Sequence, residues 1–287
     1  MASYLCRLRI TASVLFFLVI RYIGMNGASA ASAPSSKDAA RPDGNQVIQV
    51  VFSDVDGTLV HYPEHIPAQD PAILALPPSS TGLRAVISQE TLRKCQEIRQ
   101  SGRKLVLVSG MRTTTLLHRL PFLPRADAYC SEAGGRIFYP TSNTNEIKIE
   151  PLRYKGATAE SLSSFGLEED LEWRKIMEEA AGSDGFEGQD LASMASGTAQ
   201  MIPASQRKGP LWEFARKLES LGLVLDTKGY ATSFRVTARQ QPASSMKSKE
   251  AFQDLLEQHI VFPPEVATRT NLGSVDFYPV SSGKKHW

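Results

Sequence analysis

Two aspartates separated by one residue are the strongest chemical signal in the sequence. Asp54 and Asp56 open the hexapeptide Asp-Val-Asp-Gly-Thr-Leu at 54–59, directly after an apolar run at 47–53. Two carboxylates in one turn repel each other unless a cation joins them, and oxygen ligands suit Mg²⁺, which also binds phosphate. One carboxylate can attack phosphorus while the other moves protons to the leaving oxygen and from water. The alternative is a solvated turn, because Asp and Gly are common turn residues.

Hydrophobic patterning predicts the elements that position these aspartates. Residues 47–53 are β-branched and apolar, which predicts a buried parallel strand. Its carboxyl end is the edge of an open α/β sheet where ligands bind. Residues 62–80 contain five prolines and are predicted to be an irregular insertion. The elements that follow alternate: a helix from 88 to 102, a strand at 104–109, a short helix at 113–120 and a strand at 128–131. This alternation is typical of a doubly wound, Rossmann-like α/β core with a parallel sheet.

The pattern changes near residue 136 and indicates a second unit. Helices at 168–181, 210–221 and 246–259 and strands at 223–226, 231–238 and 274–278 are predicted there. They form an α+β module inserted after the third core strand, which we interpret as a lid. The five predicted parts are a targeting segment at 1–33, a linker at 34–46, the first part of the core at 47–135, an inserted α+β cap at 136–272 and an incomplete return to the core at 273–287.

Charge and cysteine content exclude several protein classes. The chain has 32 Lys and Arg against 30 Asp and Glu. Three of the basic residues, Arg7, Arg9 and Arg21, precede Ala33 in a stretch with no acidic residue, so the remainder is close to neutral. There is therefore no electrostatic case for binding nucleic acid. The 3 cysteines contain no C-x-x-C pair and cannot build a disulfide framework.

The N-terminus has the pattern of a targeting segment. Two arginines precede an apolar run at 12–20, and small residues follow at 27–33. The run is shorter than the roughly 20 apolar residues that span a bilayer, so we expect no stable membrane span in the mature chain. We expect entry into the secretory route, with a secreted, endomembrane or plastid destination left open. The alternative is a buried N-terminal helix.

The hexapeptide after a buried strand resembles the first signature of the haloacid dehalogenase (HAD) superfamily of phosphatases. The resemblance implies that Asp54 is the nucleophile and Asp56 the general acid/base, and that Asp54 and the Asp56 carbonyl bind Mg²⁺. The second signature would be Ser109 with Gly110, which hold the phosphoryl oxygens. The third would be Lys284, whose ammonium offsets charge between nucleophile and phosphate.

Two further residues are candidates for contacts to the substrate phosphate. Thr58 offers a hydroxyl next to the aspartates, and Arg112 follows the second signature. Arg112 and the weaker candidate Arg136 could equally form surface ion pairs.

Residues 131–135 and the large insertion resemble the Cof-type branch, which includes sucrose-phosphate phosphatase-like enzymes. The resemblance therefore implies a Mg²⁺-dependent phosphatase that acts on a sugar phosphate or a similar small phosphate ester. Two alternatives stay open: a non-catalytic binder of a phosphorylated ligand, and a phosphomutase of the same fold. The oligomeric state is also left open.

One departure from the family pattern affects the expected activity. The family carries a fourth signature of acidic residues after the third, whereas only Lys285, His286 and Trp287 follow Lys284. We therefore expect a truncated version of a longer enzyme, with an incomplete metal site and no activity as written. We also expect the strand at 47–53 to have an uncovered edge, which favours aggregation.

Other conspicuous side chains favour structural roles. Cys130 has no His partner placed near it by the sequence, which favours a small buried residue over a nucleophile. Trp173, Trp212 and Phe214 fall on predicted helices with apolar neighbours, which indicates the core of the lid.

Overall fold

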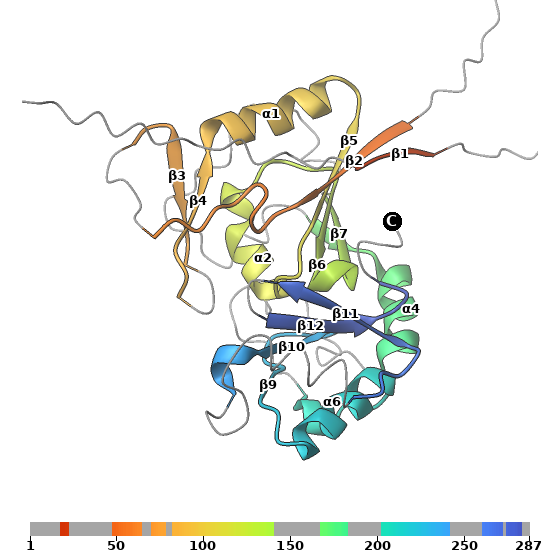
Figure 1. The fold of residues 1–287 in the computed structure, drawn as a ribbon. Helices are drawn as coiled ribbons and strands as arrows, with labels where there is room; N and C mark the ends of the chain where they lie inside the picture. The colour runs from red at the N-terminus through yellow and green to blue at the C-terminus, as the bar shows by residue number, and fades with distance from the viewer. Residues whose placement is uncertain are drawn as a thin grey trace, which may run out of the picture.

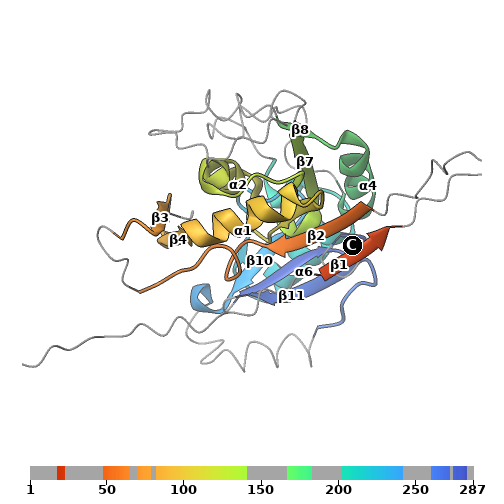
Figure 2. The same cartoon turned by 90° about the horizontal axis from the view of Figure 1, so that it is seen from above.

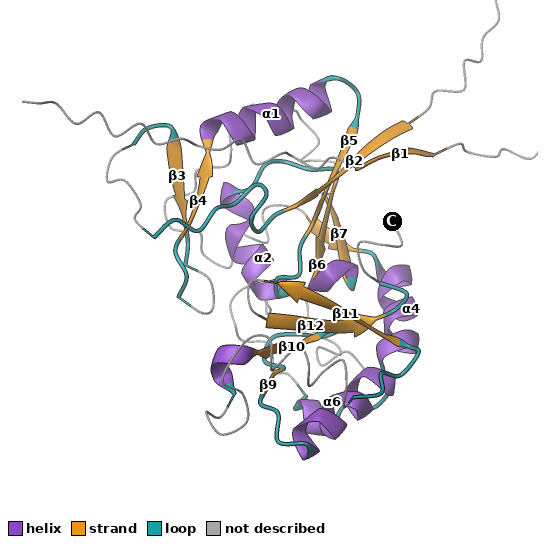
Figure 3. Ribbon diagram, in the orientation of Figure 1, coloured by secondary structure: helices purple, strands orange, loops and turns teal. Residues whose placement is uncertain are grey.

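The computed structural model describes residues 18–22, 48–64, 70–78, 82–140, 167–182, 202–241, 260–271 and 274–282. Within these ranges the chain forms a six-stranded sheet, a four-stranded sheet and a two-stranded hairpin (Figures 1 and 3). The helix predicted at 246–259 and the predicted site residue Lys284 lie outside the described residues.

The six-stranded sheet is the core of the α/β fold. Its order is β1-β2-β5-β6-β7-β8. The strands are β1 (Leu18–Tyr22), β2 (Ile48–Asp54), β5 (Lys104–Val108), β6 (Ala128–Ser131), β7 (Arg136–Pro140) and β8 (Leu167–Glu169). β2, β5 and β6 pair in parallel, and the other pairings are antiparallel. The parallel centre confirms the predicted α/β class.

Side chains along the central strands alternate between two buried faces, as the two-residue repeat of a strand requires. The helices of the described chain are α1 (Gln89–Gln100), α2 (Thr113–Arg119), α4 (Leu171–Ala181) and α6 (Pro210–Ser220). Leu105 and Leu107 join the hydrophobic cluster that α1 and α2 cover. Val106 and Val108 join a second cluster with Trp173 of α4. Both faces are thus covered by helices, which is the doubly wound arrangement.

Helix α1 begins where the sequence predicts. The Ser88 hydroxyl accepts a hydrogen bond from the Thr91 N–H at 3.0 Å, which caps the first turn. Gly102, two residues beyond the helix, has φ +82°, a conformation that favours glycine. The chain then enters β5 directly.

The second sheet has its own hydrophobic core. Its antiparallel strands are β9 (Leu225–Asp226), β10 (Phe234–Thr237), β11 (Val266–Asn271) and β12 (Ser274–Pro279), in the order β11-β12-β10-β9. Trp212 and Phe214 of α6 pack against this sheet, where the rings of Phe234 and Phe277 stack with centroids 4.7 Å apart. The structure therefore confirms that these helix aromatics are core residues. Figure 1 shows the second sheet beside the end of the core where β6 finishes.

Several strands depart from the predicted organisation. β7 and β8 extend the core sheet, whereas we expected the cap to begin at residue 136. β12 lies between β10 and β11, whereas we expected residues from 273 onward to return to the core. All six residues of β12 are buried, a pattern shared by central strands of either kind of sheet. The stretch predicted to be irregular at 62–80 contains β3 (Ile73–Leu76), which pairs with β4 (Ala85–Ser88).

The edge of β2 is paired in the structure. β1 lies antiparallel to β2, with Leu18 opposite Phe52 and Tyr22 opposite Ile48 (Figure 2). The expected uncovered edge is therefore wrong for the described chain. The targeting role of residues 1–33 stays a prediction. No helix in the described ranges is long and apolar enough to cross a membrane.

Phe277 provides a test of the second core. It is 0% exposed, so we expect Phe277→Ala to lower the free energy of unfolding by about 3–5 kcal/mol. The measurement is urea denaturation followed by circular dichroism. Val261 is 81% exposed, and Val261→Ala should change the same quantity by less than about 0.5 kcal/mol. Equal losses in the two variants would contradict the packing described.

Candidate active site

The parallel pairing of β2 with β5 brings the first two predicted signatures together. Asp54 is in register with Val108, so Ser109 leaves β5 beside the turn that carries the aspartates. That turn is closed by a hydrogen bond from the Gly57 N–H to the Val60 carbonyl at 2.8 Å. Gly57 has φ +80°, a conformation that residues with a side chain rarely adopt.

The two aspartates have different surroundings. Both are half-buried. The Asp54 carboxylate accepts a hydrogen bond from the Val55 N–H at 2.8 Å. The Asp56 carboxylate accepts a hydrogen bond from the Ser109 hydroxyl at 2.9 Å through Oδ2. Its Oδ1 accepts from the Tyr62 hydroxyl and lies 3.1 Å from Nη1 of Arg119. The Asp56 side chain is therefore held by three donors.

Arg119 and Tyr62 form a buried clamp on Asp56. Arg119 is 1% exposed, its Nη1 donates to the Tyr62 hydroxyl at 2.8 Å, and its guanidinium lies 5.6 Å from the centroid of the Tyr62 ring. Burial, and then the neighbouring Asp56, raise the pKa of Tyr62 to about 12. The phenol is therefore a neutral hydrogen-bond donor at neutral pH.

Neither member of this clamp is predicted from the sequence. Tyr62 lies in the stretch that we expected to be irregular. Arg119 stands near Leu116, Leu117 and Leu120 on the buried side of α2. A cation among apolar helix residues must have a buried partner, which is a usable signal. The partner Asp56 is 63 positions away, so the sequence does not identify it.

The Ser109 loop is fixed by its own hydrogen bonds. The Ser109 N–H donates to the Cys130 carbonyl at 3.0 Å. Its hydroxyl accepts from the Met111 N–H at 3.1 Å while it donates to Asp56. Ser109 is thus brought to the aspartates as the sequence predicts. Gly110 follows in the same loop, and Thr58 lies half-buried in the turn of the aspartates. Contacts of these three residues to a phosphate stay predictions.

The two arginine candidates form ion pairs. Arg112 pairs with Asp226 of β9, and its guanidinium lies 5.0 Å from the Tyr230 ring centroid. Arg136 is buried and makes a bidentate pair with Glu169, with distances of 2.7 and 2.6 Å. The sequence allowed for surface ion pairs at both positions. The structure corrects this for Arg136, whose pair is internal, and places Arg112 between the two sheets.

The donor set fits Mg²⁺ at one of the two aspartates. Mg²⁺ in phosphoryl-transfer sites is held by one or two carboxylates together with substrate phosphate and water. Asp54 offers such a carboxylate at the carboxyl end of β2. The Asp56 carboxylate is instead paired with the Arg119 guanidinium, and the Asp56 carbonyl stays a predicted ligand. Among the described residues, no three His, Cys, Asp or Glu side chains gather to hold a metal.

Cys130 is a core residue, as predicted. It lies in the cluster between β6 and α4, and burial raises the pKa of its thiol to about 12. A thiol with this pKa is almost wholly protonated at neutral pH and is therefore a poor nucleophile.

No protein-family profile matches the chain, and no curated protein sequence matches it. Solved structures give remote matches. BT1666 from Bacteroides thetaiotaomicron, described as a phosphatase of the HAD superfamily, is 14% identical with a TM-score of 0.35, over 86% of this chain and 73% of that one. Trehalose-6-phosphate phosphatase from Aspergillus fumigatus is 15% identical with a TM-score of 0.26, over 79% of this chain and 60% of that one.

A haloacid dehalogenase-like hydrolase from B. subtilis is 13% identical with a TM-score of 0.30, over 70% of each chain. Identities and TM-scores are low for all three proteins. The function is therefore inferred from this chain's own residues.

The buried clamp predicts an asymmetry between two Arg→Met variants. Arg119→Met leaves Asp56 without its cation, and removal of one partner from a buried ion pair costs about 3–5 kcal/mol. Arg93→Met removes an exposed pair with Glu90 and should leave the urea midpoint unchanged. Denaturation of both variants beside the wild type measures the difference. A midpoint unchanged in Arg119→Met would contradict the clamp.

Thiol accessibility gives a second test. Cys95 and Cys130 are buried, and burial raises the pKa of each thiol to about 12. In a Cys6→Ser variant we expect no reaction with a disulfide reagent at pH 8 until urea unfolds the chain. Rapid labelling of Cys130 in the folded protein would contradict the burial of β6.

Proposed function

We propose that this chain is a HAD-type phosphatase that hydrolyses a phosphomonoester through an aspartyl-phosphate on Asp54. The observation that carries the proposal is the meeting of two predicted signatures at one sheet edge. Asp54 is the last residue of β2, and Asp56 lies in the turn that follows it. Ser109 follows β5, and its hydroxyl lies 2.9 Å from Asp56 Oδ2. The carboxyl ends of parallel strands are where open α/β sheets bind ligands.

The proposed reaction has two displacements at phosphorus. In the first, an Asp54 oxygen bonds to phosphorus, the ester P–O bond breaks, and a proton from the Asp56 carboxyl goes to the leaving oxygen. In the second, a water oxygen bonds to phosphorus and gives its proton to Asp56. The bond to Asp54 then breaks and free phosphate leaves. Tyr62 and Arg119 hold Oδ1 of Asp56. Its Oδ2 is therefore assigned to proton transfer, once the Ser109 hydroxyl that donates to it has turned to the phosphoryl oxygens.

The proposed cofactor is Mg²⁺, held at the Asp54 carboxylate together with the substrate phosphate. It would supply positive charge to the phosphoryl oxygens. We further propose that the Ser109 hydroxyl and the Gly110 N–H bind these oxygens, with Thr58 as a further donor. Lys284 keeps its proposed role as a cation near the phosphate.

The proposed substrate is a small phosphate ester, with a sugar phosphate as the first choice. Support comes from the second sheet, which sits against the loop that follows Ser109. Arg112 of that loop pairs with Asp226, and Glu132 accepts a hydrogen bond from Thr232 at 2.7 Å. A unit seated over this edge leaves room for a small molecule more readily than for a folded protein.

A second candidate function is phosphate-ligand binding without turnover. The observation that favours it is the set of three donors on the Asp56 carboxylate, one of them a guanidinium. Both oxygens of the Asp56 carboxylate therefore already accept hydrogen bonds. This candidate and the phosphatase both predict phosphate binding, and only the phosphatase predicts release of phosphate.

Two Asp→Asn variants test the proposed mechanism. We expect Asp54→Asn to abolish phosphate release, because an amide cannot form the phosphoryl-enzyme. We expect Asp56→Asn to retain slow phosphorylation but to lose about 10²–10⁴-fold in turnover. The measurement is phosphate release from a panel of hexose monophosphates and p-nitrophenyl phosphate with Mg²⁺, with intact mass after acid quenching.

The outcomes separate the candidates. A phosphorylated Asp56→Asn chain and an inert Asp54→Asn chain support the phosphatase. Substantial turnover by Asp54→Asn would rule out the aspartyl-phosphate. Phosphate binding by the wild type without any release favours the binder, and isomerised sugar without free phosphate identifies a mutase. Asp70→Asn, at an exposed position whose side chain accepts a hydrogen bond from the Ala72 N–H, leaves both aspartates intact and is the matched control.

A further inference from the structure

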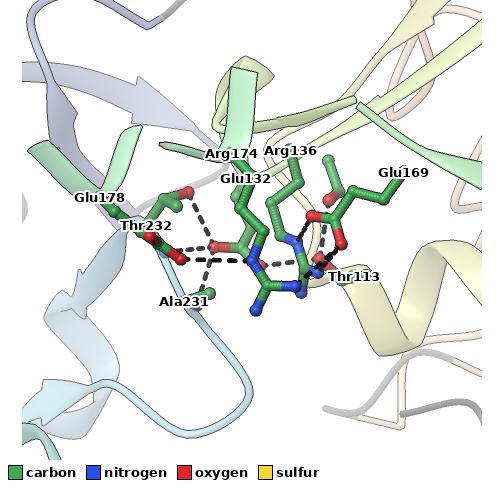
Figure 4. Close-up of polar contacts among 9 residues, drawn as sticks. Thr113, Glu132, Arg136, Glu169, Arg174, Glu178, Ala231 and Thr232 are labelled. Atoms are coloured by element: carbon green, nitrogen blue, oxygen red, sulfur yellow. Dashed lines mark hydrogen bonds and ion pairs between the residues drawn. The ribbon is translucent and has the colours of Figure 1, made fainter. Parts of the chain in front are cut away.

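The carboxylate of Glu132 is completely buried where the second sheet meets the core. The side chain is 0% exposed and follows β6 directly. Its Oε1 accepts a hydrogen bond from the Thr113 hydroxyl at 2.8 Å. Its Oε2 accepts from the Ala231 N–H at 2.8 Å, the Thr232 N–H at 2.7 Å and the Thr232 hydroxyl at 3.0 Å (Figure 4). One side chain thus binds α2 of the core and the chain that leads into β10.

These four donors are uncharged, and they belong to two different units. Burying a carboxylate is costly unless hydrogen bonds replace its hydration. Three of the four bonds here come from Ala231 and Thr232. Separation of the second sheet from the core would therefore leave Glu132 with only the Thr113 hydroxyl among these donors.

The backbone at Glu132 is strained and lies against the Ser109 loop. Glu132 has φ +54° and Ala133 has φ +59°, a conformation that residues other than glycine rarely adopt. Such outliers persist where surrounding contacts hold them. The Glu132 N–H donates to the Met111 carbonyl and the Ala133 N–H donates to the Ser109 carbonyl, both at 2.9 Å. The strained turn is therefore bonded directly to the loop that carries Ser109.

The turn and the second unit are in close contact at Gly135. A Cβ added at Gly135 would lie 1.9 Å from Oγ1 of Thr232. The Trp173 indole of α4 donates to the Gly134 carbonyl at 2.8 Å. Thr232 is therefore packed directly against the turn, and the turn is hydrogen-bonded to the Ser109 loop.

We propose that Glu132 is a positioning residue that couples the seating of the second sheet to the geometry of the Ser109 loop. When Ala231 and Thr232 are seated on the Glu132 carboxylate, the strained turn is held and its N–H groups fix the carbonyls of Ser109 and Met111. When they are not seated, the turn relaxes and the Ser109 loop loses these bonds. The catalytic meaning of this coupling rests on the proposed function, but the coupling itself is a property of the fold.

A neighbouring group of ion pairs has a purely structural role. Arg136 and Glu169 are joined by two hydrogen bonds and connect β7 to β8 within one sheet. Arg174 pairs with Glu169 and, at 3.4 Å, with Glu178 in the same region (Figure 4). These pairs join α4, β7 and β8 to one another rather than to the second sheet. They supply the control variant.

The experiment is hydrogen–deuterium exchange of the full chain without ligand, read at peptides that cover 109–112 and 229–235. The variants are Glu132→Ala, Glu132→Gln and the control Glu178→Ala, whose side chain is 40% exposed. We expect Glu132→Ala to speed exchange about tenfold in both peptides, which corresponds to about 1.4 kcal/mol. Glu132→Gln should restore most of the protection, because its amide oxygen can still accept from Ala231 and Thr232 and its NH₂ can donate to Thr113. Glu178→Ala should match the wild type in both peptides.

A second readout connects the coupling to the site. With p-nitrophenyl phosphate, Glu132→Ala should lower kcat about tenfold or more, and Glu132→Gln should recover most of it. Faster exchange at 229–235 with unchanged exchange at 109–112 would overturn the coupling, since the second unit would then loosen without effect on the loop. If Glu132→Ala fails to fold, exchange in Glu132→Gln and Thr232→Val at the same two peptides decides the coupling instead. If the wild type releases no phosphate, the proposed function fails, and the exchange data still decide the coupling.

Discussion

The parallel pairing of β2, β5 and β6 is the constraint on which the site depends. Parallel strands end at the same edge, so the turn after Asp54, the loop at Ser109 and the turn at Glu132 must share one small volume. Their polar groups satisfy one another. Ser109 donates to Asp56, and the turn at Glu132 donates to the backbone of the Ser109 loop. The residues proposed to act in catalysis at this edge are therefore held in place by hydrogen bonds with one another.

Most buried charge is compensated within one unit, whereas the Arg112–Asp226 pair and the Glu132 carboxylate connect the two units. Arg119 neutralises Asp56 within the core, and Arg235 pairs with Asp276 across β10 and β12 of the second sheet at 2.5 Å. Glu132 differs because backbone N–H groups of the other unit solvate it. Hydrogen bonds to uncharged donors are more easily exchanged than a buried ion pair is broken. Opening the contact between the units would therefore remove the hydrogen bonds on Glu132 and also break the Arg112–Asp226 ion pair.

The local sequence pattern was sufficient to predict most of the helices and strands, but not which elements or side chains they contact. The apolar strands, the Ser88 cap and the glycine after α1 specify β2, β5 and α1, because each is decided by neighbours in sequence. The destination of β12 could not be predicted, since a strand buried on both faces suits either sheet. At the site, Asp54, Asp56 and Ser109 follow from strand ends, whereas Arg119 required knowledge of a contact across 63 positions. A side chain whose partner is distant in the sequence, as for Arg119, is noticeable only as a charged residue among apolar ones.

The bonds from Glu132 to Ala231 and Thr232 span 99 and 100 positions, and this separation has a consequence for how the chain folds. Contacts of such range carry a high loop-closure entropy and form after local structure. During synthesis, β2 to β7 emerge long before residue 232. Over that interval the Glu132 carboxylate remains hydrated and its backbone is free to adopt an unstrained conformation. The strained turn is therefore among the last features to form. The core is translated before the second unit, so the contact of Glu132 with residues 231–232 forms only after the second unit has been synthesised.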